Sequence, residues 1–256
     1  MSRIVTLLTD FGDEDGFVGA MRGVILSRAP DVQLVDLAHH VPRGDVAKAA
    51  RVLRRAAVHF PAGTVHCSVV DPGVGTERAA VAVEAGRQYF VAPDNGLLGE
   101  VLDALGGAQA AHLLRAPVSR RATVSSTFHG RDVFAPGVAA LAAGVSIAEL
   151  GPPAGNLQRL ARAAGGQVVE VDRFGNLITD LPIPQGEVEL VIAGHRLRGP
   201  VSAYGAVGVG ALVLVRGSEG TLEVAVRDGS AADRLGVGVG ATVACAALPI
   251  GSQSAK

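Results

Sequence analysis

The chain has little of several features that mark common classes of protein. It contains no tryptophan, two tyrosines and seven phenylalanines in 256 residues. Few aromatic side chains are therefore available for the stacking platforms that bind single-stranded nucleic acid. Charges of opposite sign almost cancel, with 23 Lys and Arg against 24 Asp and Glu, so no broad field gathers phosphates. We expect no nucleic-acid partner.

Cysteine and long apolar runs are also scarce. The two cysteines, Cys67 and Cys245, lie far apart in apolar stretches without Cys-x-x-Cys spacing. This predicts buried thiols in a reducing compartment rather than a disulfide. No apolar run approaches the ~20 residues of a membrane-spanning helix, and Asp10 ends the first run too early for a signal peptide. We expect a cytoplasmic protein with no membrane partner.

The first 160 residues alternate short β-branched runs with helical patterns. Such alternation is typical of an α/β domain in which helices cover both faces of a mostly parallel sheet, like a sandwich. Strands are expected at residues 4–8, 32–37, 64–70, 79–84, 89–91 and 112–114. Helices are expected at residues 16–28, 45–58, 99–105 and 134–143, with Asp45 capping the second.

A segment rich in Gly and Pro at residues 151–156 ends this alternation. It places a domain boundary within residues 151–166 and predicts domains at 1–160 and 161–256. The second domain has short runs with frequent Gly, which predict a small antiparallel β-barrel or sandwich. Its expected strands are residues 168–171, 190–192, 211–215, 221–226 and 241–244, and Pro182 and Pro184 predict a loop between the first two.

Two carboxylates directly follow predicted buried strands. Asp10 closes the first strand and Asp71 the third, and polar residues at this edge of an α/β sheet commonly meet ligands. A carboxylate at Asp10 is suited to accept both hydroxyls of a ribose. Its spacing is equally consistent with a cap for the helix that starts near Gly16.

Metal and phosphate sites are not supported. The acidic residues between Asp10 and Gly16 lack the ligand spacing of an EF-hand. His39 and His40 are adjacent on an extended segment, so their side chains point in opposite directions, as in an ordinary loop. The glycines form neither a dinucleotide fingerprint nor a P-loop. We expect no bound metal.

A histidine lies among polar residues at Thr127–Asp132, just before a predicted helix. Taken alone, His129 fits a structural hydrogen-bonding role better than a catalytic one. Together with Asp71 and Arg78 it would supply a carboxylate, a guanidinium and an imidazole, which can orient one water and hold hydroxide-like charge. Spacing does not tell whether the three converge.

Five distinct segments follow one another along the chain: LLTDFG at 7–12, VVDPGVGT at 69–76, VAPDNG at 91–96, TFHGRDVFAP at 127–136 and VDRFGNL at 171–177. They strongly resemble the S-adenosyl-L-methionine (SAM) hydroxide adenosyltransferases, the water-using relatives of the fluorinating and chlorinating enzymes. The resemblance extends from about Ile4 to Val243. It implies an α/β N-terminal domain, a β-barrel C-terminal domain, and a homotrimer with active sites between the N-domain of one subunit and the C-domain of the next.

The resemblance also implies a reaction. Water attacks ribose C5′ of the substrate SAM, methionine leaves, adenosine forms, and no cofactor takes part. Asp71, Arg78 and His129 match the residues that serve the nucleophile, a set that the halogenating relatives do not keep. Asp10 matches the carboxylate that holds the ribose diol.

Further binding residues are implied in the second domain. Asp172 and Asn176 match residues that meet the methionine amino group and the nucleoside, although Asp and Asn are also common in strand-end turns. Ser218 aligns with a contact to the methionine carboxylate, and backbone groups near Arg227 and Asp228 align with adenine contacts. Halogenating relatives carry Arg where this chain has Glu219, so the carboxylate must be held differently.

Two other functions stay open. The first is a halogenase, or an enzyme that brings another nucleophile to C5′, which the Asp71, Arg78 and His129 set argues against. The second is a non-catalytic module that binds SAM or adenosine, which would bind tightly and release no adenosine.

Overall fold

The computed structural model describes residues 3–115, 124–161 and 165–248. The chain divides into two compact units, Met1–Leu160 and Ala161–Lys256. Each unit has a hydrophobic core of its own, and the larger unit has one on either face of its sheet.

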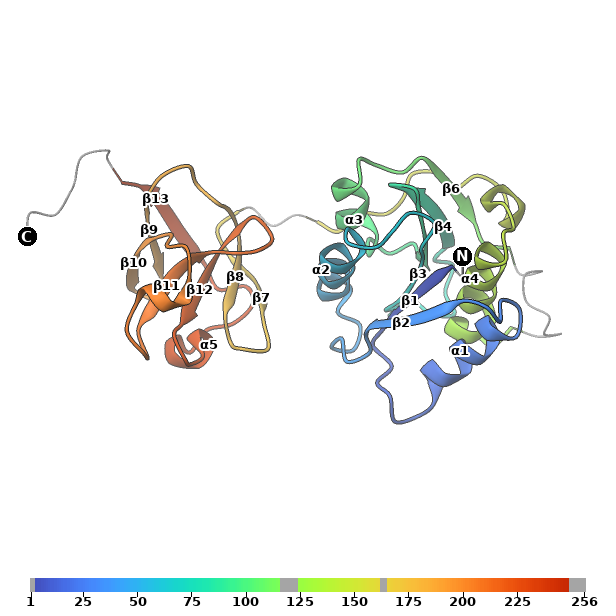
Figure 1. The fold of residues 1–256 in the computed structure, drawn as a ribbon, viewed down its shortest axis with the longest axis horizontal. Coiled ribbons are helices and arrows are strands. Elements are labelled where there is room, and N and C mark those ends of the chain that lie inside the picture. Colours follow the sequence, from blue (N-terminus) through green and yellow to red (C-terminus); the bar gives the residue numbers. More distant parts are fainter. Residues whose placement is uncertain (1–2, 116–123, 162–164, 249–256) are drawn as a thin grey trace, which may run out of the picture. The chain divides into compact units, whose positions relative to one another are not determined.

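The first unit is built on a mixed six-stranded sheet (Figure 1). The three pairings from β2 through β1 and β3 to β5 are parallel, whereas β4 runs antiparallel to β5 and β6. The strand order is β2-β1-β3-β5-β4-β6. The strands are β1 (Ile4–Thr9), β2 (Gln33–Ala38), β3 (Val65–Val69), β4 (Ala80–Ala85), β5 (Gln88–Pro93) and β6 (Ala110–Leu113).

Helices cover both faces of this sheet. On one face α1 (Phe17–Leu26) and α4 (Ala135–Ala142) pack over the core that contains Leu7. On the other face α2 (Val46–Ala57) and α3 (Gly99–Ala104) pack over the core that contains Leu8 (Figure 1). Neighbouring leucines serve opposite cores because side chains alternate along a strand. The expected α/β architecture of this part is confirmed.

Short irregular turns flank α4. One turn of π-helix, η2 (Gly130–Phe134), leads into it, and a 3₁₀ turn, η3 (Ile147–Leu150), follows it. Single π turns inserted beside α-helices are often found at functional sites. The predicted cap of α2 is confirmed, because the Asp45 side chain accepts a hydrogen bond from Lys48 N at 2.8 Å.

The second unit consists mainly of antiparallel sheet (Figure 1). A four-stranded sheet has the order β11-β12-β8-β7 and a three-stranded sheet the order β10-β9-β13, and residues from both share one core. The strands are β7 (Val168–Val171), β8 (Leu177–Pro182), β9 (Val188–Ile192), β10 (His195–Gly199), β11 (Leu212–Arg216), β12 (Thr221–Val226) and β13 (Val243–Ala247). Between them lie a 3₁₀ turn, η4 (Tyr204–Ala206), and a short helix, α5 (Ala231–Leu235).

Two predictions for the second unit are wrong. The expected loop around Pro182 is instead β8, which ends at Pro182 opposite Thr221. Proline is tolerated there because a strand can end on a residue that lacks an N–H, and Pro184 lies beyond the strand. Cys245 is exposed rather than buried, because Val243 is the residue of β13 that reaches the core of this unit and the four residues after it are exposed. Cys67 is buried as expected, and burial raises the pKa of its thiol to about 12.

In the described part of the chain, every helix is too short or too polar to cross a bilayer.

Candidate functional site

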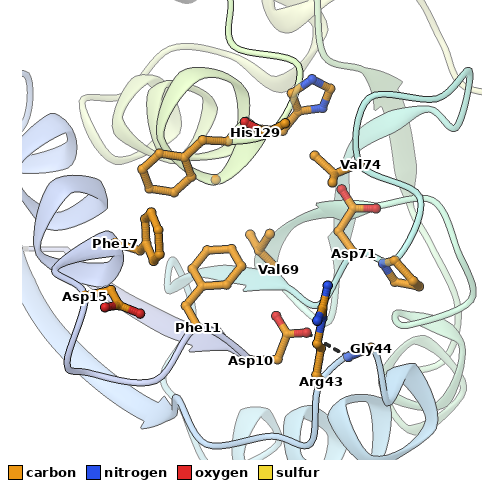
Figure 2. A pocket seen from close by; sticks show the side chains of 14 residues that line it. Asp10, Phe11, Asp15, Phe17, Arg43, Gly44, Val69, Asp71, Val74 and His129 are labelled. Atoms are coloured by element: carbon orange, nitrogen blue, oxygen red, sulfur yellow. Dashed lines mark hydrogen bonds between the residues drawn. The ribbon is translucent and has the colours of Figure 1, made fainter.

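A pocket of about 760 Å³ lies in the first unit, where β1 and β3 end. Parallel strands bring the loops that follow them to a common edge. The pocket is lined by the loop after β1, the loop after β2, the loop after β3 and the segment before α4 (Figure 2). The lining residues are Asp10, Phe11, Asp15, Phe17, Arg43, Gly44, Val69, Asp71, Pro72, Val74, Thr127, Phe128, His129 and Gly130.

Asp10 belongs to the pocket and not to a helix cap. Its Oδ2 accepts a hydrogen bond from Gly44 N at 2.8 Å (Figure 2). Helix α1 begins after Gly16, which has a positive φ of 73°, and it has no side-chain cap. The capping alternative for Asp10 is therefore wrong, and its carboxylate lines the wall of the pocket.

Asp71 and Arg78 form a nearly buried ion pair at the end of β3. Arg78 Nε lies 2.9 Å from both carboxylate oxygens of Asp71, and Arg78 Nη2 donates to Oδ2 as well. The side chains are only 4% and 11% exposed, respectively. The guanidinium also lies over the Phe134 ring, 5.1 Å from its centroid. Contacts on several sides hold this cation in a fixed place.

Arg78 also contacts His129, which begins the turn before α4. Arg78 Nη2 lies 2.9 Å from His129 Nδ1. A guanidinium only donates, so Nδ1 accepts and the neutral imidazole carries its proton on Nε2. Burial and then the charge of Arg78 lower the pKa of His129, against opposing effects of Asp71 and Asp132. The structure thus brings Asp71, Arg78 and His129 together.

Close packing joins the two loops that carry these residues. Gly75 has φ 78°, and a Cβ built on it would lie 2.5 Å from Ser126 O. The buried Asp132 carboxylate accepts hydrogen bonds from Ser125 N at 2.9 Å and from the Arg131 guanidinium. The segment just before His129 is therefore held at Ser125 by Asp132 and lies against Gly75 at Ser126.

The pocket has an aromatic wall that the sequence analysis missed. Phe17 packs edge-on against Phe128, with 5.1 Å between ring centroids, and Phe11 packs at 6.2 and 6.1 Å from these two rings. In Figure 2, Phe11 and Phe17 lie across the pocket from Asp71. Phe11 directly follows Asp10 in the sequence and Phe128 directly precedes His129, so their place in the pocket could have been predicted from these neighbours. The local sequence does not indicate that Asp15, Arg43 or Phe17 would line the pocket.

The other predicted binding residues belong to the second unit. Asp172 Oδ1 accepts from Phe174 N at 2.8 Å and from Asn176 N at 2.9 Å, and Asn176 Nδ2 donates to Asp172 Oδ2 at 2.9 Å. These contacts form the turn between β7 and β8, which agrees with the alternative that Asp172 and Asn176 are strand-end turn residues. Ser218 is exposed on the connection between β11 and β12.

Arg227 and Asp228 follow β12. The Arg227 guanidinium donates to Val207 O at 2.7 Å, and its backbone N–H and C=O pair with Ala211 O and Gly210 N at 3.1 and 2.8 Å. Asp228 is exposed and has a positive φ of 57°. Arg227 thus bonds within the unit through its backbone groups and one guanidinium N–H. The exposed Asp228 carboxylate lies 3.9 Å from Arg227 Nε.

Across residues 3–115, 124–161 and 165–248, no three His, Cys, Asp or Glu side chains are placed to hold one metal ion.

Fold and site together define an α/β protein whose ligand pocket lies at the carboxyl ends of parallel strands and joins an Asp-Arg-His cluster to an aromatic wall. More particularly, the chain belongs to the SAM hydroxide adenosyltransferase family. The family's N-terminal domain matches residues 5–151 and its C-terminal domain matches residues 166–244.

Similar proteins cover almost the whole chain. A protein of Salinispora tropica named (R)-S-adenosyl-L-methionine hydrolase is 42% identical over 247 residues, 91% of this chain and 94% of the relative. One of the same name from Thermus thermophilus is 45% identical over 260 residues, 94% and 98% of the two chains. A fluorinase of Actinoplanes sp. is more distant, 28% identical over 213 residues, 70% of this chain and 71% of the relative.

The fold has also been seen in a crystal structure of a conserved protein of Thermotoga maritima, described as uncharacterized. The two structures agree with a TM-score of 0.87 at 33% identity, covering 95% of this chain and all of the other.

Proposed function

We propose that the protein hydrolyses SAM to adenosine and L-methionine by attack of water or hydroxide at ribose C5′. The new bond joins the nucleophile oxygen to C5′, and the C5′–S bond breaks with its electron pair passing to sulfur. The positive sulfonium thereby becomes a neutral thioether, and one proton is released. The observation that carries this proposal is the contact of Asp71, Arg78 and His129 beside the pocket that contains Asp10.

The pocket supports binding of a nucleoside. Asp10 offers a carboxylate whose position is fixed by Gly44 N, and a fixed carboxylate suits the adjacent hydroxyls of a ribose. The aromatic wall of Phe11, Phe17 and Phe128 supplies an apolar surface in the same pocket. The relatives named (R)-SAM hydrolase, at 42% and 45% identity, support SAM as the substrate.

The cluster favours binding of hydroxide over deprotonation of water by the imidazole. Because Nδ1 of His129 accepts from Arg78, the remaining imidazole nitrogen carries a proton and can only donate. The opposite tautomer would place two donors 2.9 Å apart. We therefore assign Arg78 and His129 to hold hydroxide-like charge, and Asp71 to hold Arg78.

The remainder of the proposal rests on the family. We propose that residues 1–160 and 161–256 act as an α/β domain and a small β-barrel domain of a cytoplasmic homotrimer that needs no cofactor. In this arrangement Asp172, Asn176, Ser218, Arg227 and Asp228 contact the substrate from the C-domain of the neighbouring subunit. The family relationship across both units supports this arrangement. Light scattering tests it, since an active monomer would exclude a shared site.

The reaction is tested with purified protein and SAM in halide-free buffer made with ¹⁸O-water, following adenosine and methionine by mass spectrometry. Label at the adenosine 5′-oxygen is expected, and added chloride should produce no 5′-chloro nucleoside. Intact SAM after prolonged incubation would refute hydrolysis, and a product that forms only with halide would indicate halogenation.

A further inference from the structure

The His39 side chain is nearly buried and has a polar contact at each ring nitrogen, unlike an ordinary loop histidine. Its side chain is only 9% exposed, and Nδ1 lies 2.9 Å from Thr9 Oγ1. Nε2 lies 3.0 Å from Asp36 Oδ1, a polar contact whose angle departs from that of a hydrogen bond. Burial alone would raise the pKa of Asp36, but Arg22 and His39 hold it below its ordinary value. The imidazole therefore sits between a charged anchor on β2 and a hydroxyl at the end of β1.

These contacts hold the chain on both sides of Asp10. Thr9 precedes it, and Thr9 Oγ1 accepts from Phe11 N at 3.3 Å. Gly12 N donates to the backbone oxygen of His39 at 2.8 Å. The third tether is the bond from Gly44 N to the Asp10 carboxylate. The segment His39–Gly44 thus fixes the loop after β1 at three points.

The series Thr9, His39 and Asp36 has the order hydroxyl, imidazole and carboxylate of a nucleophilic triad. That role does not fit this place, because Thr9 is completely buried and its oxygen already accepts from Phe11 N. The Thr9 hydroxyl accepts this bond through a lone pair, so its O–H can donate a hydrogen bond to His39 Nδ1. The series therefore supports the loop and does not face the ligand.

We propose that His39 is the positioning residue that holds the Asp10 carboxylate in place to bind the ribose hydroxyls, a role that rests on the proposed function. A carboxylate selects a diol only while its orientation is held, because hydrogen-bond strength falls steeply with distance and angle. Without the imidazole, the Thr9 hydroxyl loses this partner, and of the three tethers the loop keeps its backbone bond to residue 39 and the contact from Gly44.

The test compares inhibition by adenosine and by 2′-deoxyadenosine, which lacks one hydroxyl of the diol. The wild-type protein should prefer adenosine by about tenfold or more. In His39→Ala, Ki for adenosine should rise by about tenfold and the preference should shrink to about threefold or less, with kcat within about twofold. A residue that only supports the fold would weaken both nucleosides equally.

Two further variants sharpen this comparison. His39→Asn places an amide oxygen near the position of Nδ1 and should restore most of the preference for adenosine. His40→Ala is the matched control, because the His40 side chain is 72% exposed and its contact is Asp13 at 3.4 Å. It should behave as the wild-type protein. If His39→Ala does not fold, Thr9→Val takes its place, because it removes the hydroxyl that contacts His39 Nδ1. The same loss of preference is expected, and a full preference in Thr9→Val would refute the role of His39.

The outcomes separate this proposal from the proposed function. If the wild-type protein releases adenosine from SAM and His39→Ala keeps the full preference, the role of His39 is refuted and hydrolysis stands. An equal loss for both nucleosides also refutes it, and makes His39 structural. If the wild-type protein neither cleaves SAM nor binds adenosine, the proposed function fails, and the positioning role fails with it.

Discussion

Arg78 Nη2 lies 2.9 Å from Nδ1 of His129, so a permanent cation fixes the tautomer of a neutral imidazole. The two residues are 51 positions apart in the chain. Asp71 balances the guanidinium charge from the other side. Burial and then the charge of Arg78 lower the pKa of His129, and this lowered pKa sets the expected response of the enzyme to pH.

Activity should fall on the acid side only below the ordinary histidine pKa of 6.5. Burial and Arg78 lower the pKa of His129, so the neutral form persists to a lower pH than in a free imidazole. The profile of kcat/KM from pH 4.5 to 9 should be level above about pH 7 and decline through the lowered pKa. An acid limb centred above 6.5 that is lost in His129→Ala would contradict the lowered pKa of His129, whereas one that remains in this variant would report ionisation of the bound water to hydroxide. Circular dichroism at each pH separates titration from unfolding.

Removing a member of the cluster should slow turnover without weakening nucleoside binding. Asp71→Asn frees Arg78 from its charged partner, and His129→Ala removes a donor to the nucleophile. Each should lower kcat by about 10²-fold or more while the Kd for adenosine changes little. Single-turnover kinetics and calorimetry measure the two quantities. Asp13→Asn, at an exposed position, is the control. Equal losses in binding and turnover would make the cluster structural.

The close approach of the two loops can be tested at Gly75. Alanine there is strained by the positive φ, and its Cβ would lie 2.5 Å from Ser126 O, which must move. Gly63→Ala has a similar φ of 83° with no atom within 4 Å. Gly63→Ala should lose about 1 kcal/mol of stability from the positive φ alone. Gly75→Ala should lose more, because a backbone oxygen must also move, and only this variant should lose about tenfold or more in kcat/KM. Matching losses of activity would refute the loop contact.

The folded protein should become less stable below neutral pH because of His66. Its ring is buried on β3, with Nδ1 2.7 Å from Thr6 Oγ1 and Nε2 2.9 Å from Gln88 Oε1. Burial lowers the pKa of His66 to about 4 from 6.5, against the effect of Gln88. Between pH 6.5 and pH 4, His66 is therefore protonated in the unfolded chain but neutral in the folded protein. The contribution of His66 to the free energy of unfolding is fully present above about pH 6.5 and falls by about 3 kcal/mol as the pH approaches 4.

Urea unfolding at pH 7 and at pH 4.5 measures this loss. His66→Gln should flatten the dependence on pH, although it lowers stability at pH 7 because it disturbs the buried contacts. His59→Gln, at an exposed position, should keep the wild-type dependence. An unchanged slope in His66→Gln would assign the effect to other groups.

Much of the fold could be predicted from the sequence, because helices and strands are set by neighbours along the chain. The periodicity of apolar residues located each α-helix and strand that the structure describes in the first unit, although not the short turns η2 and η3, and Asp45 was recognised as a cap from its position alone. Strands β8 and β10 were missed. Strand β8 was missed because it ends at Pro182, and proline argues against a strand. Strand β10 was missed because it begins with two exposed polar residues, His195 and Arg196, and therefore lacks a regular alternation of apolar and polar residues.

The sequence by itself determined the α/β class of the first unit, the family, and the two carboxylates that follow strands. Tertiary structure decided which side chains meet. Asp10 faces a pocket instead of capping α1, His39 reaches Thr9 across 30 positions, and Arg78 reaches His129. Local patterns report which way a side chain faces on its own element. Contacts between distant residues depend on the order of strands in the sheet and on the paths of the loops, which no short window of sequence contains.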